Sequence, residues 1–241
     1  MPAFNNAKTI AQAIDGLPDI VDQTVVVDDG SADDSGRIAQ EHGARVVRHV
    51  RNRGYGGAQK TGYAEALKAG ADIIVMVHAD FQYDPALLPD IVTPVIRGEA
   101  DVCIGSRMHD KKSARKGGMP LWRFIPNIAL TAVEDAVLGL GLSEYHSGYR
   151  AFSRKVLMRI PFEENSDNYV FDSEVLAQIA AGKFRAAEIA VPTRYFKEAA
   201  SPNFFKSTEY GMMTLAVLGR YLLHRAHLRT FPQFNIKSIP S

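Results

Sequence analysis

Short apolar runs alternate with helix-like segments along the first half of the chain. Each run is rich in aliphatic residues and ends in polar ones, which is typical of strands buried in a parallel sheet. The pattern predicts strands at residues 24–27, 45–50, 72–77 and 101–104. It predicts helices, each ending near a glycine, at residues 7–16, 34–43, 57–70 and 85–98. This alternation indicates an α/β fold with a mostly parallel sheet and helices on both faces.

The second half of the chain is more helical. Its pattern predicts helices at residues 120–142, 171–181 and 207–225, and short strands at residues 148–152 and 186–191. No linker rich in proline, glycine or serine separates the two halves. We therefore expect one α/β domain over residues 1–195, and a helical C-terminal appendage over residues 196–241 that packs on or beside it.

Composition excludes several classes of protein. Lysine and arginine number 28 against 27 aspartates and glutamates, so the net charge of +1 does not suit a nucleic-acid-binding protein. The lone cysteine, Cys103, excludes an internal disulfide and a cysteine-cluster metal site. The longest apolar run, residues 73–77, is far shorter than the ~18 residues needed to cross a membrane. We expect a cytoplasmic protein that is at most peripheral at the inner face of the membrane.

Polar clusters follow two of the predicted strands. Asp28-Asp29-Gly30-Ser31 comes after the first strand, and His78-Ala79-Asp80-Phe81-Gln82 comes after the strand at 72–77. Ligands of open parallel sheets bind at the carboxyl ends of the strands, so both clusters are candidate site segments. Aspartate and serine also cap helices, and a turn with a helix cap remains an alternative for the first cluster.

The second cluster has the spacing of a metal site. His78, Asp80 and Gln82 are two residues apart, so on an extended segment their side chains face the same way. Carboxylate and amide oxygens suit Mg²⁺ or Mn²⁺, and these ions also bind substrate phosphates. We therefore predict Mg²⁺ or Mn²⁺ as the cofactor, where it would neutralise charge on a departing diphosphate.

Six short motifs occur in a fixed order along the chain. They are Pro2-Ala3-Phe4-Asn5, Asp28-Asp29-Gly30-Ser31, Asn52-Arg53-Gly54-Tyr55-Gly56, His78-Ala79-Asp80-Phe81-Gln82, Gly105-Ser106-Arg107 and Ser147-Gly148-Tyr149-Arg150. Each motif is weak alone, and the ordered set is specific. Over about residues 2–195 the chain resembles the family 2 glycosyltransferases with the GT-A fold, and most of all the dolichol-phosphate mannosyltransferase and polyprenyl-phosphate glycosyltransferase group.

The resemblance assigns expected roles to individual residues. The metal ligands would be Asp80 and Gln82 with His78, and the catalytic group would be Asp80, Arg107, Arg150 and Asp172. The two arginines are expected near phosphates, to which a guanidinium donates two parallel hydrogen bonds. Helix capping is the alternative role for Asp172. The expected nucleotide-binding residues are Pro2, Ala3, Phe4, Asp28, Asp29, Lys60 and Ala79.

The sequence departs from the family pattern at two places. His78 stands where the family's D-x-D signature has its first aspartate, which predicts weaker metal binding or coordination by Asp80 alone. The apolar strand that normally precedes Pro2 is absent, since the chain opens at Met1. We therefore expect a GT-A sheet that lacks its first strand, with unpaired backbone groups at that place.

The resemblance implies an inverting transfer of a hexose from a UDP- or GDP-linked sugar, with polyprenyl or dolichyl phosphate as the favoured acceptor. A lipid phosphate is already an anion, whereas a sugar hydroxyl needs a carboxylate base such as Glu144 or Asp172. His146 is either structural or close to the acceptor. Amphipathic segments at residues 119–142 and 207–229 either lie on a membrane surface or pack on the sheet.

Two other functions remain as alternatives. A non-catalytic nucleotide-sugar-binding protein would fit the substitution at His78 and the missing strand. A sugar nucleotidyltransferase would share the nucleotide-binding topology, but the glycine- and lysine-rich loop expected near its first strand is absent. Turnover separates the first alternative from a transferase, because a binding protein releases no nucleoside diphosphate.

Overall fold

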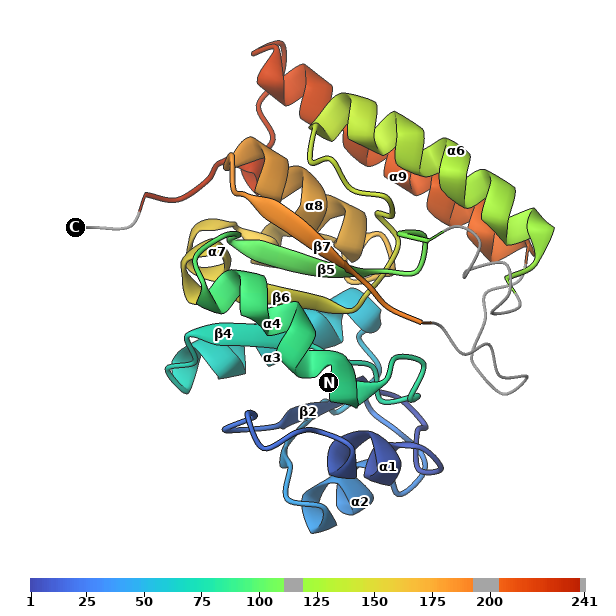
Figure 1. Ribbon diagram of the computed structural model, residues 1–241, viewed down its shortest axis with the longest axis vertical. Coiled ribbons are helices and arrows are strands. Elements are labelled where there is room, and N and C mark those ends of the chain that lie inside the picture. Colours follow the sequence, from blue (N-terminus) through green and yellow to red (C-terminus); the bar gives the residue numbers. More distant parts are fainter. Residues whose placement is uncertain (111–118, 193–203, 239–241) are drawn as a thin grey trace.

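The computed structural model describes residues 1–110, 119–192 and 204–238, which form an α/β fold with two sheets (Figure 1). The first sheet is parallel throughout, and its strands in spatial order are β1 (Pro2–Ala3), β2 (Val25–Asp28) and β3 (Arg45–Arg48). In the second sheet β6 runs antiparallel to both of its neighbours, whereas β5 and β7 are parallel. Its strands in order are β4 (Ile73–Met76), β6 (Arg150–Ser153), β5 (Val102–Ser106) and β7 (Ala186–Ala190).

The division into two sheets follows from the shortness of β1. This strand has two residues, and Pro2 and Ala3 pair with Val27 and Asp28 of β2. So short a strand offers too few backbone groups to join β2 on one side and β4 on the other. The predicted mostly parallel sheet is confirmed, and the predicted lack of a full first strand corresponds to this two-residue β1.

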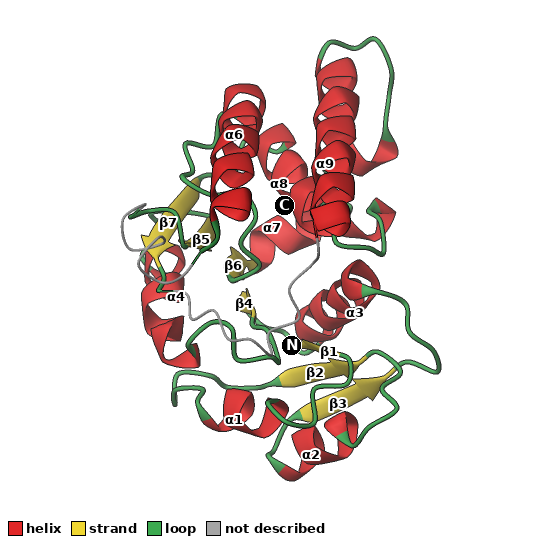
Figure 2. Ribbon diagram, turned by 90° about the vertical axis from the view of Figure 1, so that its right-hand side faces the viewer, coloured by secondary structure: helices red, strands yellow, loops and turns green. Residues whose placement is uncertain are grey.

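Helices cover both faces of the sheets (Figures 1 and 2). All predicted helices are present, and α8 has the predicted bounds. The short α7 was not predicted. The α-helices are α1 (Ile10–Asp15), α2 (Ser35–Glu41), α3 (Tyr55–Lys68), α4 (Leu88–Ile96), α6 (Leu121–Leu138), α7 (Arg154–Arg159), α8 (Phe171–Ala181) and α9 (Phe204–Arg225). Three short 3₁₀ turns lie at Pro85–Leu87, Phe162–Glu164 and Pro232–Phe234.

Helix α3 joins the two sheets. Tyr63 on α3 packs edge-on against Phe152 of β6 (ring centroids 5.5 Å apart), in the largest apolar cluster. Gly62, on the same helix, faces Val27 of β2 so closely that a Cβ there would touch its side chain. On the opposite face of the second sheet, α4 contributes Ile91 to another apolar cluster. The strand ends that carry the predicted site are therefore fixed to one scaffold.

Helices α6 and α9 form an outer layer over α8 (Figure 1). Val217 and Tyr221 of α9 are buried in the same apolar cluster as Val175 of α8, so the predicted C-terminal helix packs on the α/β domain. The predicted domain boundary after residue 195 lies outside the described residues. In the described part of the chain, no helix is both long enough and apolar enough to cross a bilayer.

Candidate active site

Two buried aspartates at the carboxyl end of β2 have different surroundings. Asp29 accepts hydrogen bonds from the backbone amides of Arg53 and Gly54, both at 2.9 Å, and its Oδ1 lies 2.6 Å from His49 Nδ1. These contacts use both carboxylate oxygens. Asp29, which was predicted to hold the nucleotide, therefore shapes the loop that follows β3.

Asp28 keeps an acceptor oxygen that is not hydrogen-bonded. Its Oδ1 accepts a hydrogen bond from the Ser31 amide (2.9 Å), and its Oδ2 lies 3.3 Å from Arg48 Nε. Within the described residues Oδ2 has no hydrogen-bond partner, although Asp28 is only 1% exposed. Buried oxygens of this kind are uncommon and need an explanation. Asp28 Oδ2 faces Gly36 of α2, and a surface depression of about 350 Å³ is lined by the nearby residues Gly30, Ser31, Arg48, His49 and Val50.

The segment after β1 lies against the turn that follows β2. Pro2 and Ala3 form β1 itself, and Phe4 follows with 49% of its surface exposed. The Asn5 amide donates a hydrogen bond to Ser31 Oγ (3.0 Å). The residues predicted to line the base pocket are thus next to Asp28 and Asp29, as the motif order implied.

The segment after β4 forms a tight turn that presents Asp80 and Gln82. Phe81 adopts a left-handed conformation (φ 58°), and the Gln82 amide donates a hydrogen bond to Asp80 Oδ1 (3.0 Å). Ala79 is buried, and its carbonyl accepts a hydrogen bond from Thr9 Oγ1 (2.7 Å). That contact holds the predicted metal segment against the loop preceding α1.

Asp80 and Gln82 fit part of a divalent-metal site. Both residues are only half-buried, and the carboxylate of Asp80 is engaged in the described structure through Oδ1 and the Gln82 amide. No three His, Cys, Asp or Glu side chains gather closely enough in the described residues to hold a metal by themselves. A Mg²⁺ or Mn²⁺ ion here would therefore take its other ligands from water and substrate phosphate, which is usual for Mg²⁺.

His78 has a different environment from its two predicted partners. Its ring lies between Tyr55 (centroids 5.9 Å apart, planes 14° apart) and Tyr83 (5.4 Å, 36°). A Cβ on Gly148 would overlap His78 Nε2. Burial lowers the pKa of His78 against the opposing charge of Asp80, so the neutral ring is favoured. The geometry supports packing better than metal ligation.

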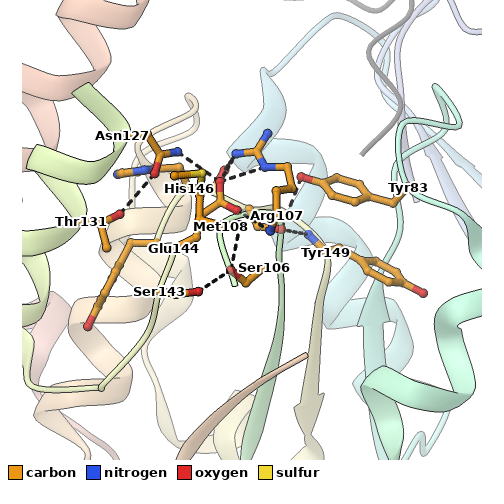
Figure 3. Close-up of polar contacts among 12 residues, drawn as sticks. Tyr83, Ser106, Arg107, Met108, Asn127, Thr131, Ser143, Glu144, His146 and Tyr149 are labelled. Carbon is orange, nitrogen blue, oxygen red and sulfur yellow. Dashed lines mark hydrogen bonds and ion pairs between the residues drawn. The ribbon is translucent and has the colours of Figure 1, made fainter. Parts of the chain in front are cut away.

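Arg107, at the carboxyl end of β5, forms a closely paired contact with Glu144 (Figure 3). Its backbone amide donates to Glu144 Oε2 (2.7 Å) and its Nε to Oε1 (2.8 Å), while Asn127 Nδ2 also donates to Oε1 (3.2 Å). Burial alone raises the pKa of Glu144, but the charge and hydrogen bonds of Arg107 outweigh burial and lower it. Glu144 is thus an ionised partner of Arg107.

Arg150 is buried, with 1% of its surface exposed. Its guanidinium donates hydrogen bonds to the backbone carbonyls of Ser147 (2.7 Å), Asp172 (2.9 Å) and Tyr145 (3.1 Å). The sequence pattern led us to expect a phosphate contact. The structure instead shows Arg150 joining the loop before β6 to α8, because its donors are directed at carbonyl oxygens.

Asp172 lies in the first turn of α8 without capping it. The helix has Val170 at its N-cap and no side-chain cap hydrogen bond, so the capping role considered for Asp172 is wrong. Instead the carboxylate accepts hydrogen bonds from the Tyr55 hydroxyl and Gln59 Nε2, both at 3.0 Å. Burial and the charge of Asp172 raise the pKa of Tyr55 well above its usual range, which keeps the hydroxyl protonated.

Lys60 contacts the protein rather than an open site. Its ammonium lies 2.7 Å from Asp167 Oδ1 and also donates to the Asn165 carbonyl. The glycine-rich turn before it is packed just as closely, since a Cβ on Gly56 would overlap the Ser166 carbonyl. The predicted position of Lys60 near the donor is therefore not reproduced by its contacts.

The sequence analysis missed a buried carboxylate beside His146. Glu134 on α6 is fully buried, and one carboxylate oxygen lies 2.7 Å from His146 Nε2. The His146 ring meets Tyr210 of α9 edge-on (5.8 Å). A charged residue on an amphipathic helix is normally expected to face water, so the sequence pattern carried no signal for Glu134. The sequence also gave no indication that Tyr55 and Tyr83 would lie next to the ring of His78.

These segments converge around the end of β4. Tyr55 lies beside the His78 ring and donates a hydrogen bond to Asp172, and Asp80 follows His78 by two residues. The charges of Asp80, Asp172 and Arg107 also bear on the pKa of His78, so three of the predicted catalytic residues contribute to its electrostatic surroundings. The fourth, Arg150, lies directly behind Asp172, with 3.5 Å between Nη1 and Oδ1.

Comparison with known proteins is consistent with this arrangement. Residues 1–160 match the sequence profile described as glycosyl transferase family 2. An uncharacterized protein of Methanocaldococcus jannaschii is 36% identical over 196 residues, covering 81% of this chain and 80% of that protein. The UDP-N-acetylglucosamine–dolichyl-phosphate N-acetylglucosaminyltransferase of Methanococcus voltae is 28% identical over 213 residues, covering 81% and 84%.

A solved structure shows the same fold. Glucosyl-3-phosphoglycerate synthase from Mycobacterium tuberculosis, in complex with UDP, superposes with a TM-score of 0.70 at 22% identity, covering 99% of this chain and 85% of that chain. The family match, the relatives and this fold agree with the ordered motifs. The chain belongs to glycosyl transferase family 2, has the GT-A fold, and is a glycosyltransferase that resembles the dolichol-phosphate group.

Proposed function

We propose that the protein transfers a hexose from a UDP- or GDP-linked sugar to a polyprenyl or dolichyl phosphate, with inversion at the anomeric carbon. The observation that carries the choice of acceptor is the state of the buried carboxylates near His78. Glu144 pairs with Arg107, and Asp172 accepts hydrogen bonds from Tyr55 and Gln59. Carboxylates engaged in this way are poor general bases, and a phosphate acceptor requires none.

The proposed reaction is a direct displacement. A phosphate oxygen of the acceptor attacks the anomeric carbon while the bond to the nucleoside diphosphate breaks on the opposite face. Asp28 Oδ2, which is buried 3.3 Å from Arg48 Nε and has no hydrogen-bond partner in the described structure, is the acceptor we assign to the nucleoside. Asp29 contributes by holding the loop after β3, and Arg107 borders the diphosphate region.

Asp80 and Gln82 are the residues we assign to a Mg²⁺ or Mn²⁺ ion. When bound, such an ion neutralises charge that develops on the leaving diphosphate. The glucosyl-3-phosphoglycerate synthase of M. tuberculosis has been solved with Mg²⁺ and UDP, which supports the same class of donor complex for this chain. The protein's part is to keep Asp80 in place through its turn and through the contact of Ala79 with Thr9.

The acceptor class places the enzyme at a membrane surface, and α6 supports this. Its described polar residues Asn127, Thr131, Glu134 and Asp135 are not exposed, while the exposed positions of the described part of the helix are apolar. These positions are Leu121, Trp122, Ile125, Pro126, Ala129, Ala132, Val133 and Ala136. Helix α9 has exposed Thr208 and Glu209 near its start, and after them its exposed positions are apolar (Met212, Leu215, Ala216, Gly219, Leu222 and Leu223) as far as exposed Arg225. An apolar face with basic residues at its end suits a bilayer interface with anionic lipids.

A thermal-unfolding panel followed by a transfer assay tests the proposal. UDP, GDP, CDP and dTDP are compared with and without Mn²⁺. A nucleotide at about 100 times its Kd should raise Tm by about 5–10 °C. The matching nucleotide sugar is then incubated with polyprenyl phosphate in vesicles or with a soluble glycoside. Transfer to the lipid phosphate is expected, whereas transfer only to the hydroxyl acceptor, or nucleotide binding without turnover, would contradict the proposal.

A further inference from the structure

Five aromatic rings form a continuous stacked column through the candidate active site. Tyr169 stacks on Tyr55 (centroids 5.3 Å apart), Tyr55 on His78 (5.9 Å), His78 on Tyr83 (5.4 Å) and Tyr83 on Tyr149 (5.5 Å). The angle between neighbouring planes is between 13° and 36°. Tyr169 is 68% exposed and Tyr149 is fully buried, so the column runs from the surface into the core.

The column connects four segments that are distant in sequence. Tyr55 begins α3, Tyr83 follows the turn of Asp80 and Gln82, and Tyr149 precedes β6. His78 is the central ring and lies two residues after the last residue of β4, Met76. The Tyr55 hydroxyl bonds to Asp172 of α8 (3.0 Å), and Ser147 Oγ bonds to the Tyr83 hydroxyl (3.3 Å). A ring at position 78 thus lies between the metal segment and the loop before β6.

The surroundings of His78 select for a ring and against a carboxylate. The imidazole is nearly parallel to the ring of Tyr55 and tilted by 36° against the ring of Tyr83, and the faces of both tyrosine rings carry negative electrostatic potential. An aspartate there would place a charge against those faces and would lose the stacking area. Gly148 fits the edge of the ring, since any Cβ at that position would overlap Nε2.

We infer that His78 is a positioning residue whose ring aligns Tyr55 and Tyr83, and that it is not a metal ligand of this transferase. The metal segment then consists of Asp80 and Gln82. By packing against Tyr55 and Tyr83, the ring keeps the Tyr55 hydroxyl within hydrogen-bond distance of Asp172. It also keeps the turn that presents Asp80 in place at the end of β4. This inference rests on the proposed function only for its reference to a metal, because the column itself is present without any ligand.

Ring-retaining and ring-deleting variants distinguish the two roles of His78. His78→Phe keeps the stack, whereas His78→Ala removes it and His78→Asp restores the family's ligand type. Without ligand, we expect His78→Ala and His78→Asp to lower Tm by about 5 °C, and His78→Phe to stay within about 2 °C of the wild type. His227→Asp, at an exposed position, controls for the charge change. A Tm for His78→Asp equal to that of the wild type would overturn the inference.

A second pair of variants covers the chance that phenylalanine is too large beside Gly148. Tyr83→Phe keeps a ring next to His78 and should unfold near the wild-type temperature, while Tyr83→Leu should behave like His78→Ala. The double variant Tyr83→Leu/His78→Ala should lose less than the sum of the two single losses, because both break one contact. Additive losses would contradict the column.

The affinity for Mn²⁺ distinguishes a metal ligand from a positioning residue, because it should fall strongly only if His78 is a ligand. The electron paramagnetic resonance signal of free Mn²⁺ is titrated with wild type and variants in the presence of UDP and, separately, GDP. His78→Phe should keep the Mn²⁺ affinity within about 3-fold. Mutating a residue that only hydrogen-bonds to a metal ligand typically lowers the metal affinity about 10–100-fold, and removing a ligand itself should lower it at least as much. A loss of tenfold or more in His78→Phe would overturn the inference. Absence of Mn²⁺ binding in the wild type would contradict the proposed donor complex. The Tm values of the His78 and Tyr83 variants would then be the remaining test of the positioning role of the His78 ring.

Discussion

The carboxylate of Glu134 lies 2.7 Å from His146 Nε2, and both side chains are buried between α6 and the loop before β6. This contact links the outer helix to the loop that also carries Glu144 and Ser147. Among the described residues of α6, polar side chains such as Glu134 face the protein, while the exposed side chains are apolar.

We expect Glu134→Ala to lower the free energy of unfolding by about 1–3 kcal/mol, because it removes the close contact between the Glu134 carboxylate and His146 Nε2 and leaves a cavity at a fully buried position. Urea denaturation at pH 7 measures the change. Val133→Ala on the exposed side of the same helix is the matched control and should change stability by less than about 0.5 kcal/mol. Equal effects of the two variants would show that the pair contributes nothing to stability.

The Arg107–Glu144 pair makes a pH-dependent contribution to stability. The pKa of Glu144 is held below its ordinary value of 4.5, so unfolding the protein would take up a proton as the pH falls below that value. The contribution is complete above pH 4.5 and is lost as the pH falls through the lower folded-state pKa. The stability of Glu144→Gln should therefore depend less on pH below 4.5 than that of the wild type, by at most about 1.4 kcal/mol per pH unit.

The measurement is a series of urea denaturation curves between pH 3 and pH 7, fitted for each variant. Glu41→Gln serves as the control, because Glu41 forms an exposed ion pair with Arg37. Parallel pH profiles for wild type and Glu144→Gln would exclude the predicted role of the pair, whatever the absolute loss of stability in the variant.

Arg150→Ala should act mainly on folding. Its guanidinium supplies hydrogen bonds to three backbone carbonyls and lies next to Asp172, so its removal leaves several buried acceptors and one buried carboxylate without it. A loss of about 3–5 kcal/mol is expected. Arg150→Lys should recover little, because an ammonium cannot reproduce the planar fork. Arg225→Ala is the exposed control. A stable Arg150→Ala protein with a selective loss of acceptor use would restore the phosphate-binding role.

The contrast between Arg150 and Asp80 shows what a sequence can predict. Apolar runs located each long strand to within a few residues, and the motifs placed Asp28, Asp80 and Arg107 at strand ends because those positions depend on local order. The contacts that Arg150 and Lys60 make could not be predicted from the sequence, because burial and partners depend on distant segments, the helix α8 and the loop at 165–167. The burial of Glu134 on α6 could not be predicted for the same reason, because its partner His146 comes close only when the chain is folded.

Asp80→Ala should abolish metal-stimulated turnover, with a loss of at least about 100-fold. The carboxylate is the strongest proposed ligand for a hard cation, and Gln82 alone supplies a neutral oxygen. Asp84→Ala is the matched control. Asp84 is four residues away and caps the following 3₁₀ turn through the Ala86 amide (3.0 Å), so its loss should cost stability but not the response to Mn²⁺. Full activity of Asp80→Ala at every Mn²⁺ concentration would refute the assignment of Asp80 as a metal ligand.

The apolar outer faces of α6 and α9 predict binding to vesicles. Ile125 is 62% exposed on α6 and Leu215 is 49% exposed on α9, and neither position is used by the site. If these side chains enter the interface, each should contribute about 1.5–3 kcal/mol, so Ile125→Glu or Leu215→Glu should weaken binding at least tenfold. Co-sedimentation with vesicles of neutral and anionic phospholipid measures the change, and added salt should weaken the part due to Arg225 and Arg229.

Ile96→Glu is the control, since Ile96 is equally exposed (59%) on α4, away from this layer. A loss of binding in Ile96→Glu equal to that in Ile125→Glu would show that any added acidic residue weakens binding, and would refute the docking face. Unchanged nucleotide-induced stabilisation in Ile125→Glu would confirm that the substitution acts on the surface and not on the site.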